Sequence, residues 1–273
     1  MCAVSHPNIV LTLGWAIKPK LYLVQEFMHG LSLNSQLYVE AWRPTTPDVL
    51  KVAADVAKGM HYLHTAFDKP VIHRDLKSAN LMLVRPPAEG AVVEVKITDF
   101  GLTREARAAD ATMAASTIAG PAGTVLWMAP EMLDGDDYSE KVDVFSYAMC
   151  LVELVHRNLP WHQSGMGQHR IPGLVTQGKR PDKQLPDDQP ALRQLIVECW
   201  AGDSADRPTF AEVIQLVEEM ISEQQARDLS RTASPRRALS ERPGGRTNHS
   251  RPASPGSGRV LGPTGYDDVM TRV

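Results

Sequence analysis

The residues best placed to do chemistry are an aspartate, a lysine and an asparagine in the sequence H-R-D-L-K-S-A-N, residues 73–80. Asp75 can accept a proton from a hydroxyl group, and Lys77 can neutralise a phosphoryl group in transfer. Asn80, five residues beyond Asp75, can turn its carbonyl oxygen toward a magnesium ion. This acid–lysine–amide spacing predicts a site for phosphoryl transfer.

Other short motifs accompany this site in a fixed order. D-F-G at 99–101 and A-P-E at 129–131 enclose a segment rich in small residues, threonine and serine. Further motifs lie on both sides: H-P-N-I-V at 6–10, L-V-Q-E-F-M-H-G at 23–30, D-V-F-S-Y-A at 143–148, L-P-W at 159–161 and C-W-A-G-D-S-A-D-R-P-T-F at 199–210. Chance agreement of so many ordered motifs is negligible, so we interpret them together.

From about residue 6 to 224, the chain resembles a eukaryotic protein kinase. K-S-A-N after H-R-D-L, and W-M-A-P-E at 127–131, are similar to the tyrosine-kinase-like branch of serine/threonine kinases, the Raf-like and mixed-lineage-like group. The resemblance implies an α+β, protein-kinase-like fold, with a mostly helical large lobe and a residual β-hairpin of the small lobe. We expect residues 1–30 to form the residual small lobe and hinge, 31–225 the large lobe, and 226–273 a disordered basic tail rich in Ser, Pro and Arg.

The resemblance also implies roles for the motif residues. Asp75 would be the catalytic base for a Ser or Thr hydroxyl of a protein substrate, and Lys77 would contact the γ-phosphate of ATP. Thr124 would lie against Asp75 and Lys77. Asn80 and Asp99 would bind Mg²⁺, which prefers oxygen ligands.

The adenine ring of ATP would meet the segment after the second predicted strand. Gln25 matches the gatekeeper position of the family. Glu26, Phe27 and Met28 match the hinge, whose backbone groups bind the base. Met82 matches the position beneath the adenine ring, although a core methionine is an equally good interpretation and both can hold.

Arg74, directly before Asp75, matches the arginine that pairs with a phosphate on the activation segment, residues 99–131. An upstream kinase would add this phosphate. The candidate acceptors are Thr112, Ser116 and Thr117, and the sequence does not choose among them.

Two further matches are structural. Asp143 matches the aspartate that accepts hydrogen bonds from the H-R-D backbone, although an aspartate early in a helix can also stabilise the helix dipole. Arg207 matches the arginine that pairs with Glu131 of A-P-E, and a bidentate Arg–carboxylate pair suits that task.

Apolar spacing predicts the strands that must hold the site. Short apolar runs at 8–13 and 21–27, around Lys18-Pro19-Lys20, predict a β-hairpin, which the resemblance makes the fourth and fifth strands of the small lobe. Three further short strands are predicted at Val71–Ile72, Leu81–Val84 and Val92–Ile97.

The predicted helices begin with residues 47–64, where apolar positions recur at helical spacing. Thr46 is the candidate N-cap, and Pro47 is the first helical residue. Residues 139–156 are apolar on nearly every face, which predicts a buried central helix. Two amphipathic helices are predicted at 190–200 and 209–224.

A kinase also grips the ATP phosphates with a glycine-rich loop and a strand lysine that pairs with a helix glutamate. These elements should precede H-P-N-I-V, where only Met1–Ser5 stand. One interpretation is a serine/threonine kinase whose missing elements lie upstream of the given sequence. The alternative is a truncated, catalytically impaired homologue that acts as a binding or scaffold module.

The composition limits the functional classes that fit this chain. Its net charge of −3 over 273 residues does not indicate a nucleic-acid partner. From residue 226 onward, nine arginines oppose four acids, so this tail carries +5 and the rest of the chain −8. The three cysteines have no metal or disulfide spacing, which suits a reducing compartment. The apolar run Ile9–Ile17 is too short to span a bilayer, so we expect an intracellular, cytoplasmic protein.

The last three residues, Thr271-Arg272-Val273, resemble a C-terminal ligand for the groove of a PDZ domain, which binds such ends by strand addition. Chance explains a match of three residues more readily than function does.

Overall fold

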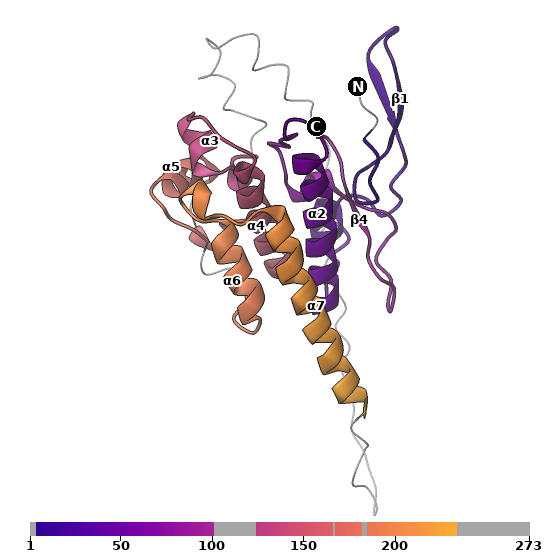
Figure 1. Ribbon diagram of the computed structural model, residues 1–273, viewed down its shortest axis with the longest axis vertical. Helices are drawn as coiled ribbons and strands as arrows, with labels where there is room; N and C mark the ends of the chain where they lie inside the picture. The colour runs from indigo at the N-terminus through magenta and orange to yellow at the C-terminus, as the bar shows by residue number, and fades with distance from the viewer. Residues whose placement is uncertain (1–3, 101–123, 166, 182–184, 234–273) are drawn as a thin grey trace, which may run out of the picture. The chain divides into compact units, whose positions relative to one another are not determined.

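The computed structural model describes residues 4–100, 124–165, 167–181 and 185–233 (Figure 1). The three candidate phosphate acceptors between 112 and 117, the Gly of D-F-G and the C-terminal PDZ motif lie outside the described residues. Most of the described chain is helical, and two small antiparallel sheets complete it. This composition agrees with the predicted α+β, protein-kinase-like fold.

Helix α4, Lys141–His156, lies at the centre of the helical part (Figure 1). Its side chains from Val142 to Leu154 are all buried. It packs against α2, Thr46–Thr65, and α6, Pro190–Cys199. The buried central helix predicted at 139–156 is therefore confirmed.

Helix α2 begins with a capping box, in which the N-cap and the third helical residue hydrogen-bond to each other. The hydroxyl of Thr45 accepts a hydrogen bond from the Asp48 amide at 3.4 Å, and the Asp48 carboxylate accepts one from the Thr45 amide at 2.8 Å. The prediction of Thr46 as the N-cap is wrong by one residue. Asp48 explains the difference. A capping box needs its acidic partner three residues after the N-cap, and Asp48 has that spacing from Thr45 and not from Thr46.

Helix α7, Phe210–Ala233, runs alongside α2 (Figure 1). It extends beyond the predicted end at residue 224, so the predicted boundary between large lobe and tail falls inside a helix. Exposed pairs one turn apart support the extension: Arg227 donates to Glu223 at 3.1 Å, and Gln224 donates to Asp228 at 3.1 Å. Side-chain pairs of this kind, together with residues of high helix propensity, stabilise a helix even where none of its faces is buried.

The first sheet pairs β1, Thr12–Ala16, with β2, Tyr22–Gln25, in a hairpin as predicted, although β1 begins four residues later than the apolar run 8–13. The second pairs β3, Leu81–Leu83, with β4, Val95–Ile97, and sets Met82 opposite Lys96. The predicted strand at Val71–Ile72 is absent from the described residues, and that prediction is wrong. The Val71 amide donates to the Leu63 carbonyl at the end of α2 instead, so it is not available for a strand ladder.

The hairpin joins the second sheet through the chain just before it. The Val10 amide donates to the Ile97 carbonyl at 2.9 Å, and the Ile97 amide donates to Asn8 at 2.9 Å. Ile9 is buried in the core cluster. The hairpin itself leaves large apolar side chains exposed, with Leu13 at 63%, Trp15 at 59% and Leu21 at 75%.

Short helical segments connect these elements. The α-helical ones are α1 (Leu33–Tyr38), α3 (Pro130–Asp134) and α5 (Ile171–Thr176). The 3₁₀ turns are η1 (Ser78–Asn80), η2 (Thr124–Trp127), η3 (His162–Ser164), η4 (Gln168–Arg170) and η6 (Ser204–Asp206). Among the described residues, no helix combines the length and apolar character needed to cross a membrane.

Candidate active site

The loop that carries Asp75 is fixed by Asp143, near the start of α4. Asp143 is fully buried, and its two carboxylate oxygens accept the amides of His73 and Arg74, each at 2.9 Å. His64 of α2 also meets this carboxylate, with Nε2 at 2.9 Å. The predicted contact between Asp143 and the H-R-D backbone is therefore confirmed, and it holds Arg74 at a φ of 69°.

The ring of His73 forms a second brace. Its Nδ1 accepts the Asp75 amide at 3.3 Å, which places the ring proton on Nε2. Nε2 then donates to the Thr98 carbonyl at 3.0 Å. This ring links the catalytic loop to the residue before Asp99.

Lys77 brings together three of the four predicted catalytic side chains, its own and those of Asp75 and Thr124. Its Nζ donates to the Asp75 carboxylate at 2.9 Å and to the Thr124 hydroxyl at 3.0 Å. Thr124 is 47 residues further along the chain and begins η2. The Asp75 side chain is 33% exposed and that of Lys77 16%, so a substrate can reach the carboxylate from solvent. The arrangement sets a proton acceptor beside a fixed positive charge.

Asn80 is oriented by the same loop. Its Nδ2 donates to the Asp75 backbone carbonyl at 2.7 Å and to the Asp75 carboxylate at 3.1 Å. Because the amide nitrogen faces Asp75, the amide oxygen points the other way. A side-chain oxygen fixed in this way fits the role of a magnesium ligand.

Asp99 follows directly after a segment bonded to Asn80. The Thr98 amide donates to the Asn80 carbonyl at 3.0 Å. Asp99 itself is exposed and takes a φ of 60°, an uncommon backbone conformation for a residue other than glycine. Asp75, Asn80 and Asp99, the three predicted acid and amide positions, therefore come from two adjacent segments.

The predicted adenine-binding residues lie at the end of the hairpin. Gln25 ends β2, and the next three residues lead toward α1. Phe27 is 75% exposed, whereas Met28 is buried. Met82 forms an isolated β-bridge with Ser32, the N-cap of α1. Its predicted position beneath the adenine ring stays a prediction.

Glu26 turns its side chain away from the hinge. Its Oε1 accepts the Leu11 amide at 2.7 Å and Lys96 Nζ of β4 at 2.7 Å. Partial burial alone would raise the pKa of Glu26, but these hydrogen bonds and the charge of Lys96 bring it below the ordinary value. The ion pair thus fastens the hinge end of the hairpin to the second sheet. The Glu26 backbone amide adds a hydrogen bond to the Leu11 carbonyl at 2.9 Å.

Arg74 is the remaining predicted site residue. Its guanidinium carbon lies 5.8 Å from the ring centre of Tyr138, which is within the range of a cation–π contact. The acceptors predicted to pair with a phosphorylated segment lie outside the described residues, so that prediction stays a prediction.

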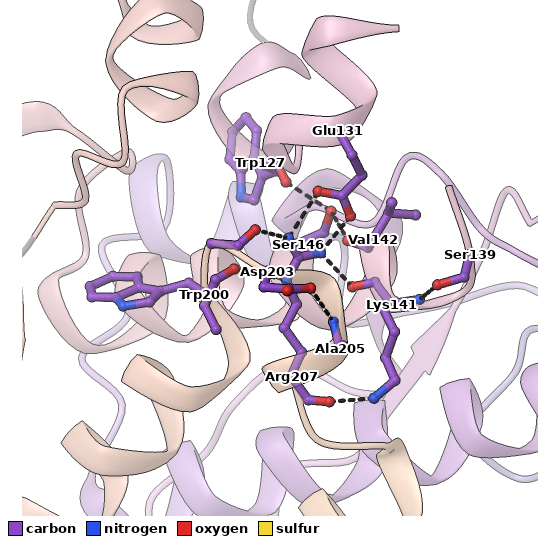
Figure 2. Close-up of polar contacts among 12 residues, drawn as sticks. Trp127, Glu131, Ser139, Lys141, Val142, Ser146, Trp200, Asp203, Ala205 and Arg207 are labelled. Atoms are coloured by element: carbon purple, nitrogen blue, oxygen red, sulfur yellow. Dashed lines mark hydrogen bonds and ion pairs between the residues drawn. The ribbon is translucent and has the colours of Figure 1, made fainter. Parts of the chain in front are cut away.

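The pair between Arg207 and Glu131 is bidentate, as predicted, and supports the end of the activation segment (Figure 2). Nη1 and Nη2 donate to the two carboxylate oxygens at 2.6 and 2.9 Å. The Ser146 hydroxyl of α4 donates to the Trp127 carbonyl at 2.8 Å in the same region. The first pair joins Arg207 to A-P-E, and the Ser146 bond joins α4 to the chain just before A-P-E.

Sequence reasoning missed Glu153, a fully buried carboxylate on α4. Three side chains donate to it: Tyr38, Ser78 and Trp127. The signal was present, because a glutamate in a largely apolar, buried helix is almost never fully buried without partners. The partners themselves come from three distant segments and could not be identified from periodicity.

Comparisons with known proteins agree with the motifs and the fold. The family model described as protein tyrosine and serine/threonine kinase matches residues 1–217. The chain is 38% identical over 224 residues to serine/threonine-protein kinase STY17 of Arabidopsis thaliana, covering 82% of this chain and 36% of that protein. It is 39% identical over 222 residues to the probable serine/threonine-protein kinase drkC of Dictyostelium discoideum, covering 81% and 28%.

A third relative is mitogen-activated protein kinase kinase kinase 7 of Homo sapiens, 34% identical over 222 residues, which cover 80% of this chain and 34% of that protein. The chain spans about a third of the length of these relatives. The predicted family and branch are confirmed. The chain belongs to the protein tyrosine and serine/threonine kinase family, in which it is similar to Raf-like, tyrosine-kinase-like serine/threonine kinases.

Proposed function

We propose that this chain carries the catalytic part of a protein serine/threonine kinase, which transfers the γ-phosphoryl group of ATP to Ser or Thr hydroxyls of protein substrates. The observation that carries the proposal is Lys77, whose Nζ lies 2.9 Å from Asp75 and 3.0 Å from Thr124. One ammonium group thereby joins a proton acceptor to the segment that leads into A-P-E. Signalling is the setting that the names of the relatives suggest.

In the proposed reaction, Asp75 orients the substrate hydroxyl and accepts its proton as the oxygen attacks phosphorus. Lys77 balances the negative charge that the transferred group carries. Thr124 fixes Lys77 between the two segments. These groups act by position and electrostatics, which dominate catalysis of phosphoryl transfer.

Members of this family use ATP with a divalent metal, and the residues present fit both. The oriented oxygen of Asn80 and the carboxylate of Asp99 would hold Mg²⁺. When bound, the ion neutralises charge on the phosphates. The backbone of 26–28 would hydrogen-bond to adenine. Met82, which bridges to Ser32 just after this segment, would pack beneath the ring.

The test is phosphorylation of a generic protein substrate by the chain with Mg·ATP, followed by phosphoamino acid analysis. We expect phosphoserine and phosphothreonine, and a loss of about 10²–10⁴-fold in rate for Asp75→Asn. Asp187→Asn is a matched control, because Asp187 is 94% exposed and forms a surface ion pair with Arg193. Equal rates for Asp75→Asn and the wild type would refute the proposal.

The same assay addresses the alternative, a binding or scaffold module. The exposed apolar side chains of the hairpin favour that function, because large exposed apolar patches often mark binding surfaces. If the wild-type chain folds but transfers no phosphate, the binding module becomes the better proposal for the chain as given.

A further inference from the structure

Glu153 is an ionisable group that the proposed reaction does not use directly. It lies on α4 with 0% of its surface exposed, among apolar neighbours on the same helix. Burying a carboxylate costs free energy unless hydrogen bonds replace its water shell. Such a group needs several hydrogen-bond donors, and the positions of these donors show which segments of the chain it holds together.

The three donors are neutral side chains, and each comes from a different segment. Oε1 accepts the hydroxyl of Tyr38 at 2.8 Å and that of Ser78 at 2.5 Å. Oε2 accepts the indole N–H of Trp127 at 3.1 Å. Both oxygens of the carboxylate are therefore engaged, and no single element supplies the network.

Two of these segments meet at the proposed catalytic contact. Ser78 directly follows Lys77, and Trp127 ends the 3₁₀ turn that Thr124 begins. Lys77 and Thr124 are themselves joined at 3.0 Å. The Glu153 carboxylate thus holds the segment next to Lys77 through Ser78, and the segment that contains Thr124 through Trp127.

We propose that Glu153 is a positioning residue of the phosphoryl-transfer site, which fixes the catalytic loop through Ser78 and the segment before α3 through Trp127 to one point of α4. The functional part of this inference rests on the proposed kinase activity. The structural part, a shared acceptor that holds both segments, is independent of it.

The ionisation state of the carboxyl group provides a direct readout. Burial raises the pKa of Glu153 to about 7, against which the three hydrogen bonds act. The titratable groups that face it are Tyr38 and Cys150, and burial raises the pKa of both well above neutrality. The carboxylate accepts from all three donors, whereas the protonated acid must donate to one of the hydroxyl oxygens.

The first experiment follows the indole N–H resonances of the ¹⁵N-labelled chain from about pH 5 to about pH 9. Loss of one resonance in Trp127→Phe assigns that of Trp127. We expect this resonance to titrate with a midpoint near 7 in the wild type and to be independent of pH in Glu153→Gln. Glu218→Gln is the control, because Glu218 is 54% exposed and pairs with Lys58 at the surface; it should titrate as the wild type does.

The second experiment measures amide hydrogen exchange. In Glu153→Gln, exchange should accelerate about tenfold or more in both 78–80 and 125–128, with α6 and α7 unchanged. Ser78→Ala should accelerate exchange in 78–80 and still leave the Trp127 titration in place, so the inference can be judged if Glu153→Gln does not fold. Uniform acceleration across the chain, or a Trp127 titration that persists in Glu153→Gln, would overturn it.

An activity measurement then separates the two proposals. If the wild type phosphorylates a peptide, Glu153→Gln should raise KM for the peptide about tenfold and leave KM for ATP within about twofold. An unchanged peptide KM would overturn the functional part. A wild type without activity would count against the proposed function, while titration and exchange would still decide whether Glu153 holds the two segments.

Discussion

Removal of the Arg207 guanidinium should destabilise the fold more than a surface ion pair could. Arg207 is 1% exposed and donates bidentately to Glu131. It also donates to the carbonyls of Ala201, Lys141 and Gly202 at 2.9, 3.1 and 3.3 Å. Arg207→Met would leave these acceptors and a largely buried carboxylate without their donor.

Breaking a buried pair by removal of one partner costs about 3–5 kcal/mol. With more than 200 residues described by the structure, each kcal/mol lowers Tm by about 2–4 °C, so Arg207→Met should melt about 10 °C below the wild type. Urea denaturation should give the matching loss of unfolding free energy. The cause is testable because the loss should be partly recovered when the partner charge is also removed.

Glu131→Gln and the double variant complete the cycle. We expect the double variant to be more stable than the sum of the single effects predicts, by about 1–3 kcal/mol. We attribute most of the destabilisation to the buried Glu131 charge left without its partner. A loss of unfolding free energy below about 1 kcal/mol for Arg207→Met, or strictly additive effects in the double variant, would refute this.

Three further predictions concern stability, each measured by denaturant unfolding. Thr45→Ala should cost about 1 kcal/mol through loss of the α2 cap, and Thr46→Ala close to nothing. Gly59→Ala should cost about 1–3 kcal/mol because its Cβ would lie 2.9 Å from the Asn8 carbonyl oxygen, whereas Gly173→Ala, with open space around it, should not. Burial raises the pKa of Glu153 to about 7 from 4.5, so the folded state keeps a proton that the unfolded state releases. Between about pH 4.5 and 7 the wild type should therefore lose about 3 kcal/mol relative to Glu153→Gln as pH rises, and parallel curves for the two proteins would contradict this.

The parts of the site that could be predicted from the sequence are those with fixed residue types at fixed spacing. Asp75, Lys77 and Asn80 lie within one loop, and their chemistry requires those residue types. The contact between Lys77 and Thr124, separated by 47 residues, was accessible only through the family resemblance. Local spacing contains no information on which distant hydroxyl meets the lysine.

The errors arise where local signals compete. Thr45 and Thr46 are both acceptable caps, and only the reciprocal bond with Asp48 decides between them. Val71–Ile72 has strand propensity, but its first amide is already used by the end of α2, and tertiary pairing overrides propensity. Helix α7 extends beyond the end of its apolar periodicity because hydrogen bonds between exposed side chains one turn apart stabilise it.

The catalytic loop is held at both ends by acids of the same helix. Asp143 accepts the amides of His73 and Arg74 at the start of the loop, and Glu153 accepts the hydroxyl of Ser78 at its end. The two acids are ten residues apart on α4, which corresponds to about 15 Å along a helix. A helix buried on all sides cannot shift without disturbing the core around it. The position of Asp75, between the two anchors, is therefore set by the packing of α4, and a substitution that loosens this helix should affect the loop even where it touches no site residue.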